Sequence, residues 1–79
     1  MTEEEKLMDE VLNTLDDMPE IAVVNLKKLV EMNNAQAIYL LGNCYNQGLV
    51  VGLDDKKAVQ LWLKSEEMVM TKNNKTIKL

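Results

Sequence analysis

At 79 residues the chain is long enough for one small domain, and its single cysteine and absent histidine exclude an internal disulfide and a Cys/His zinc site. Its net charge of −4 and its lack of arginine argue against a nucleic-acid partner, because phosphate contacts need clustered cations. No apolar run reaches the roughly 20 residues that cross a bilayer, and the acidic start, Glu3-Glu4-Glu5, is unlike a signal peptide, so we expect no membrane contact and a cytoplasmic location.

The first amphipathic segment covers about residues 3–16. Its apolar residues recur at three- and four-residue steps, which is the period of a helix that buries one face. They are Leu7, Met8, Val11, Leu12 and Leu15. Pro19 cannot continue this helix but suits the first turn of the next, for which we expect Asp17 as N-cap with Glu20 in capping-box spacing.

The second segment covers about residues 19–33 and ends at Asn33-Asn34, since asparagine tolerates the left-handed turn of a helix C-terminus. Its apolar face consists of Ala22, Val23, Leu26, Leu29, Val30 and Met32. The third segment covers about residues 35–47 and stops at Gly48. Its apolar face consists of Ala37, Ile38, Leu41, Cys44 and Tyr45.

The fourth segment covers about residues 54–70, with Asp54 or Asp55 as its N-cap. Its inward face consists of Ala58, Leu61, Trp62, Ser65, Met68 and Val69. Residues 71–79 show no periodicity, and we expect a flexible basic tail there. Four helices joined by short loops predict an all-α fold of two stacked antiparallel hairpins, forming a single domain over residues 1–70.

An internal repeat relates the second segment to the fourth. With a shift of 36 residues, Ala22 aligns with Ala58, Leu26 with Trp62 and Met32 with Met68. A repeat period in the thirties is typical of helical solenoids, in which each hairpin buries its apolar face only against its neighbours.

One stretch carries a more specific pattern. It reads Ala37-x-x-x-Leu41-Gly42-x-x-Tyr45-x-x-Gly48, followed by Val51, Asp54, Lys57-Ala58 and Trp62-x-Lys64. Over about residues 34–69 this pattern resembles a Sel1-like repeat, a relative of the tetratricopeptide repeat. The resemblance implies a short solenoid with a concave face lined by the first helix of each hairpin, and a function in binding another protein or a peptide.

Two positions depart from that pattern. Val50 stands where the family usually has a second glycine, and Ser65-Glu66 replaces a usual pair of alanines, so we expect looser packing after the fourth helix. The mid-helix Gly42 has a physical reading of its own. Glycine costs about 1 kcal/mol relative to alanine there, which makes sense if the backbone of a neighbouring helix approaches.

The parts of common catalytic sites are missing, and we expect neither an enzyme nor a cofactor. The chain has no histidine or arginine, and Cys44 falls on an apolar helix face, where a small buried hydrophobe is the plain interpretation. The paired acids Asp16-Asp17, Asp54-Asp55 and Glu66-Glu67 point apart when they lie on or near a helix.

Two surfaces are candidates for contact with a partner. Tyr39, Asn43 and Asn46 recur at i, i+4 and i+7 on the side of the third helix that we expect to face away from the core; an ordinary hydrated face is the alternative. The second surface is the loop over residues 48–53, where we expect Val51 to be buried and Leu49 and Val50 to be available for a partner or a second copy.

These features predict a protein–protein interaction module, an adaptor or scaffold. One alternative is a small acidic inhibitor or immunity-type protein that blocks a basic enzyme site through Glu3–Glu5, Asp9 and Asp16, because the first 20 residues have a net charge of −7. Another alternative is a structural homodimer that completes its core with a second copy, for which the last face of the fourth helix is available.

Overall fold

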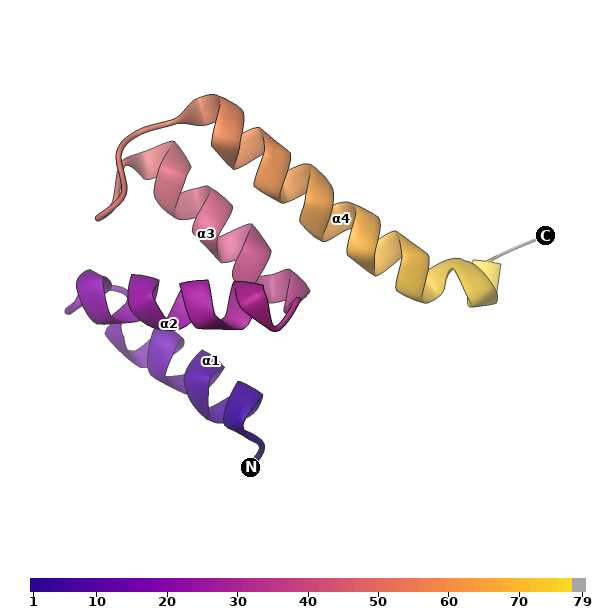
Figure 1. The fold of residues 1–79 in the computed structure, drawn as a ribbon, viewed down its shortest axis with the longest axis horizontal. Coiled ribbons are helices and arrows are strands. Elements are labelled where there is room, and N and C mark those ends of the chain that lie inside the picture. Colours follow the sequence, from indigo (N-terminus) through magenta and orange to yellow (C-terminus); the bar gives the residue numbers. More distant parts are fainter. Residues whose placement is uncertain (78–79) are drawn as a thin grey trace.

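The computed structural model describes the backbone of residues 1–77 and the side chains of residues 1–69. This part of the chain contains four helices: α1 (Glu3–Thr14), α2 (Pro19–Glu31), α3 (Ala35–Gln47) and α4 (Asp55–Ile77). Each helix runs back along the one before it, so that α1 and α2 form one hairpin, α3 and α4 form a second, and α2 packs on α3 between them (Figure 1). The predicted all-α arrangement of two stacked hairpins is confirmed.

The stack is thin. It measures 45 × 34 × 18 Å, and its shortest dimension is less than two helix diameters of about 10–12 Å each. α1 and α4 lie at the two ends of the stack, where α1 packs mainly against α2 and α4 mainly against α3.

The N-terminal hairpin begins at a capping box. The Thr2 hydroxyl accepts a hydrogen bond from the Glu5 amide, and the Glu5 carboxylate accepts one from the Thr2 amide. α1 ends at Thr14, two residues before its predicted end. Pro19 opens α2 as predicted, but the expected Asp17 cap is wrong: Met18 is the N-cap residue and α2 has no side-chain cap. Because Pro19 has no amide hydrogen, the first turn of α2 has one donor fewer to satisfy.

The hairpins are joined by a short turn of two asparagines. Asn33 has a φ of 60°, the left-handed conformation expected at this helix end, and the Asn34 amide donates to the Leu29 carbonyl at 3.0 Å. Asn34 then caps α3 by accepting from the Ala37 amide at 2.9 Å. α3 ends as predicted at Gly48, which has a φ of 67°.

α4 is longer than predicted. Asp54 caps it through the Lys57 amide, at 3.0 Å, as expected. The helix then continues to Ile77, seven residues past the expected end at 70, and this stretch contains no glycine or proline that would break it. The predicted flexible tail, residues 71–79, lies outside the residues whose side chains the structure describes. Residues 78 and 79 also lie outside the described backbone.

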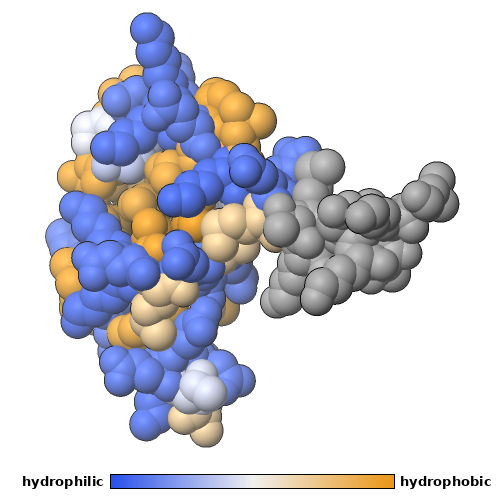
Figure 2. All heavy atoms as spheres, turned by 45° about the vertical axis from the view of Figure 1, so that its right-hand side comes forward, coloured by the Kyte–Doolittle hydropathy of each residue, from blue (hydrophilic) through white to orange (hydrophobic). Residues whose placement is uncertain are grey.

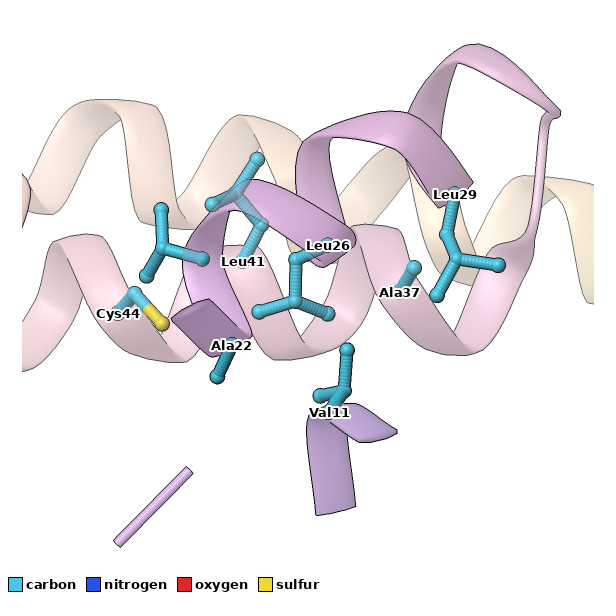
Figure 3. Close-up of a cluster of buried hydrophobic side chains, with 8 residues drawn as sticks. Val11, Ala22, Leu26, Leu29, Ala37, Leu41 and Cys44 are labelled. Carbon is cyan, nitrogen blue, oxygen red and sulfur yellow. The ribbon is translucent and has the colours of Figure 1, made fainter. Parts of the chain in front are cut away.

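The core is built around α2. Buried residues of α1, α2 and α3 meet in one cluster, with Leu26 of α2 lying between Val11 of α1 and Leu41 of α3 (Figure 3). Most of the predicted apolar face residues are buried or half-buried. Three are exposed instead, namely Leu12, Met32 and Val69. Leu12 lies on α1, at one end of the stack. Met32 lies past the end of α2, and Val69 lies beyond Ser65, which contacts the first residue of α3.

A buried polar contact was not predicted. Asn25 is buried on α2, and its side-chain amide donates to the carboxylate of Glu10 on α1. The second asparagine–glutamate bond joins Asn34 to Glu4 at 2.6 Å. Two acids of the acidic N-terminal helix are therefore used to attach α1 to the rest of the stack.

The contact between α3 and α4 explains the mid-helix glycine. A Cβ atom on Gly42 would lie 2.7 Å from Trp62 Nε1 and 3.2 Å from the Ala58 carbonyl oxygen, so the two helices approach here as the sequence indicates. Ala58 is fully buried, and so is Ala37, which belongs to the core cluster. Ser65, where an alanine was expected from the resemblance, is buried and donates to the Ala35 carbonyl at 2.8 Å. The serine thus adds an interhelical bond where looser packing was expected.

Candidate functional site

A hollow of about 310 Å³ lies between the end of α1 and one side of α3. Four of its residues, Leu40, Asn43, Cys44 and Gln47, recur at i, i+3, i+4 and i+7 and so share one face of α3. The opposite wall comes from Leu15 and Asp16, in the turn that follows α1. Leu49 closes one end, since the left-handed turn at Gly48 directs the chain back and the Leu49 amide donates to the Cys44 carbonyl at 2.9 Å.

The floor of the hollow is apolar. Leu15, Leu40 and Leu49 are half-buried and pack against the core cluster. Cys44 also lines the hollow, with only 2% of its surface exposed, and burial raises the pKa of its thiol. The thiol is therefore protonated at neutral pH and serves as an apolar surface rather than as a nucleophile.

The rim is polar and carries one carboxylate and two amide side chains. Asp16 carries a carboxylate and Gln47 an amide, and both are exposed. Asn43 is half-buried, and its Oδ1 atom accepts a hydrogen bond of 3.1 Å from Trp62 Nε1. An asparagine amide also carries two N–H donors, which this bond does not use. The site therefore offers an apolar floor with donors and acceptors around it.

Trp62 fixes the position of the Asn43 wall. Its indole lies against Gly42, donates to Asn43, and has its ring centroid 6.4 Å from that of Tyr39 at a tilt of 38°. Tyr45, also on α3, contacts Lys57 of α4, whose Nζ atom lies 5.1 Å from the centre of the tyrosine ring. These α4 side chains hold the face of α3 that carries the hollow.

The three residues predicted on the outer side of α3 do not form one free face. None of them belongs to the core cluster, but each interacts with α4. Tyr39 lies beside Trp62, Asn43 accepts from it, and the Asn46 amide is 3.4 Å from the Asp55 carboxylate. Tyr39 is still half exposed, and of the three only Asn43 lines the hollow.

Leu49 and Val50, the two loop residues predicted to be available for a partner, differ in their burial. Leu49 and Val51 pack against the core, whereas Val50 is exposed. Val50 has a φ of 67°, a left-handed conformation that a β-branched residue rarely adopts. This is the position at which the Sel1-like pattern has glycine. Leu49 is thus part of the hollow, and Val50 is not.

Leu40 and Gln47 belong to the hollow but were not predicted. Their spacing on the third helix is visible in the sequence, yet only the position of the turn after α1 makes that face one wall of a hollow. Leu15, Asp16 and Cys44 were noted as apolar or acidic residues, without a reason to bring them together.

The acidic residues of the N-terminal region are partly engaged. Glu4 and Glu10 bind asparagines, and the bond from the Thr2 amide lowers the pKa of Glu5. Asp9 and Asp16 are exposed. Of the five acids proposed for an inhibitory surface, two therefore have structural roles within this chain.

The described residues contain no group of three or more His, Cys, Asp and Glu side chains placed to hold a metal ion. No helix among them combines the length and the apolar character of a membrane span. Hydrophobic side chains on the face drawn in Figure 2 are interspersed with hydrophilic ones.

Comparison with known proteins identifies no relative. No protein-family model matches this chain, and no similar curated protein or solved structure was found. The resemblance to Sel1-like repeats therefore rests on the residues quoted above and on no matched family.

Proposed function

We propose that this protein is an interaction module that binds a short segment of another protein in the hollow between α1 and α3. The observation that carries the proposal is the combination of three half-buried leucines on the floor with a carboxylate and two amides on the rim. Apolar floors with a few polar groups that fix orientation are typical of ligand sites.

The chemistry of the hollow favours a peptide. Its volume of about 310 Å³ is at the lower end of the range for ligand pockets, about 300–1,000 Å³, which suits one or two side chains of a partner. The amides of Asn43 and Gln47 match the donors and acceptors of a peptide backbone. Asp16 favours a lysine or arginine beside the inserted side chain.

The resemblance to Sel1-like repeats supports the same surface. It implies a concave binding face lined by the first helix of each hairpin, and the hollow lies between the end of α1 and α3, which are those helices. Within this proposal the protein is a Sel1-like module of the cytosol, a compartment that suits its single reduced thiol.

A display library of random peptides tests the proposal. We expect enriched peptides to share a large apolar residue next to Lys or Arg, and Leu40→Asp to weaken their binding by about tenfold or more, because it places a charge on the apolar floor. Val24→Asp is the matched control: it adds the same charge at an exposed valine of α2 and should leave binding unchanged.

The result also separates this proposal from an acidic inhibitor. Binding that depends on burial of an apolar side chain should persist at about 1 M salt, where the Debye length is about 3 Å. Enrichment of purely basic peptides whose binding disappears at that salt concentration, with no effect of Leu40→Asp, would contradict the proposal.

A further inference from the structure

The bond between Trp62 and Asn43 fixes which way the Asn43 amide is turned. An indole Nε1–H can only donate a hydrogen bond, so the amide atom that faces it at 3.1 Å must be the oxygen. Trp62 is itself held in place, because its ring lies against Gly42 and beside Tyr39. The Nδ2 atom, which carries both amide hydrogens, is therefore the end of the Asn43 side chain that the indole leaves free.

This Nδ2 atom is accessible to a ligand. Within residues 1–69 the structure gives it no hydrogen-bond partner, and no enclosed side-chain nitrogen or oxygen of a buried or half-buried residue there lacks one. Nδ2 is therefore in contact with solvent rather than enclosed. Because Asn43 lines the hollow and its oxygen is engaged by α4, the wall on α3 presents this donor.

The wall on the α1 side has the reverse polarity. It carries Asp16, whose carboxylate oxygens accept hydrogen bonds and have no hydrogen to donate. Gln47, the third polar group of the rim, is exposed, and its amide can turn either to donate or to accept. Asn43 and Asp16 thus each offer a ligand only one kind of hydrogen bond, and the two kinds are opposite.

We infer that the partner segment lies in the hollow in one orientation, with a backbone carbonyl accepting from Asn43 Nδ2 and its Lys or Arg side chain beside Asp16. This inference rests on the peptide site proposed above. It makes Asn43 a specificity-determining residue that requires an acceptor, and Trp62 a positioning residue that acts through Asn43. A neutral carbonyl fits better than a carboxylate of the ligand, because Asp16 would repel a second negative charge in a hollow of about 310 Å³.

The need for a free carbonyl also defines the conformation of the segment. Inside an α-helix each carbonyl already accepts from the amide four residues later, and only the last four carbonyls are free. An extended segment leaves its carbonyls free along its length. The donor on Asn43 therefore favours an extended segment over the middle of a helix.

An ester scan of a peptide enriched from the display library tests for the carbonyl. Replacement of one backbone amide by an ester weakens the preceding carbonyl as an acceptor. We expect one position at which the ester weakens binding to the wild-type chain by about fivefold, which corresponds to one hydrogen bond. In the Asn43→Ala variant the same ester should cost nothing more, because its partner is already absent. Gln47→Ala, on the same face of α3, is the matched control, and in it the ester should cost as much as in the wild type.

Trp62→Phe tests the positioning by the indole. Phenylalanine keeps an aromatic ring but has no N–H, so the Asn43 amide can turn its oxygen towards the hollow. The fivefold effect of the ester should then fall below about twofold. A purely structural role of Trp62 would weaken the amide and ester peptides alike and leave their ratio unchanged, which would contradict the positioning. Circular dichroism verifies that the variant is folded.

The Leu40→Asp variant separates failure of this inference from failure of the peptide site. If Leu40→Asp weakens binding but no ester position depends on Asn43, the hollow is the site and the inferred orientation is wrong. A bound peptide that NMR shows to be helical overturns the extended conformation. If Leu40→Asp has no effect either, the peptide site itself is contradicted, and the inference is overturned with it.

Discussion

Replacement of Gly42 by alanine measures how closely α3 and α4 approach. Two effects of opposite sign compete. An alanine in mid-helix is favoured over glycine by about 1 kcal/mol. Against this, the new methyl group would lie 2.7 Å from Trp62 Nε1, 2.8 Å from Trp62 Cδ1 and 3.2 Å from the Ala58 carbonyl oxygen. The first two distances are shorter than side chains tolerate, so the indole or the helix must move.

Movement of the indole has a cost of its own. Trp62 donates to Asn43 at 3.1 Å, and losing that bond costs about 1 kcal/mol. Overpacking of a well-packed site adds about 1–3 kcal/mol. After the gain in helix propensity is subtracted, we expect Gly42→Ala to lower the free energy of unfolding by about 1–3 kcal/mol. For a domain of this size each kcal/mol corresponds to a decrease of about 4–8 °C in Tm.

The assay is urea denaturation followed by circular dichroism, with Gly52→Ala as the matched control. No atom lies within 4 Å of a Cβ at Gly52, and its φ is not positive. There the same substitution should raise stability by about 0.4–1 kcal/mol, through the unfolded chain. Opposite signs at the two glycines are the expected result.

A second change localises the effect. The residue of α2 that corresponds to Trp62 is Leu26. A leucine in place of Trp62 is small enough to leave room for a methyl group at position 42. In a Trp62→Leu background, Gly42→Ala should therefore cost much less than in the wild type, or become stabilising. If Gly42→Ala raises the stability of the wild type as much as Gly52→Ala does, the close approach is refuted.

Three further outcomes follow from the structure. Val50→Asn should raise stability by about 1 kcal/mol because asparagine tolerates the left-handed φ of 67°, whereas Val50→Thr, equally β-branched, should not; equal gains in urea denaturation would contradict this reasoning. Glu5 has a pKa below its ordinary value of 4.5 because of its bonds with Thr2, so its contribution to folding stability is present above pH 4.5 and is lost as the pH falls through the folded pKa. The Glu5→Gln variant should therefore lose less stability than wild type on acidification. An identical dependence of stability on pH in the two proteins would show that the capping box is not formed. Burial raises the pKa of the Cys44 thiol above its ordinary 9.0, so native protein at pH 8 should react with a thiol reagent at least on the order of a hundredfold more slowly than unfolded protein; comparable rates would show that Cys44 is not buried.

Local sequence signals predicted much of the fold. Residues at helical spacing identified Leu26 and Leu41 as core, since an amphipathic helix buries one face wherever it packs. Asn33 and Gly48 marked helix ends because few residues adopt a left-handed conformation. The mid-helix Gly42 indicated a close neighbour because its cost in helix propensity needs a compensating contact.

The candidate site was less predictable because it depends on tertiary placement. Asn43 was assigned to the correct helix and to a face outside the core, but nothing local shows that a tryptophan 19 residues later will donate to it. Leu40 and Gln47 become a wall only because the turn after α1 lies opposite them. The buried Asn25 bond was missed for the same reason: its partner Glu10 resembles any other exposed acid until the hairpin closes.

The central proposal is that the hollow between α1 and α3 receives a segment of a partner. The most direct measurement is an NMR titration of the isotopically labelled chain with a peptide enriched from the display library. We predict that the largest amide shift changes will map to Leu15, Asp16, Leu40, Gln47 and Leu49, which line the hollow. Changes confined to another surface, such as the exposed side of α2 around Val24, would contradict the proposal.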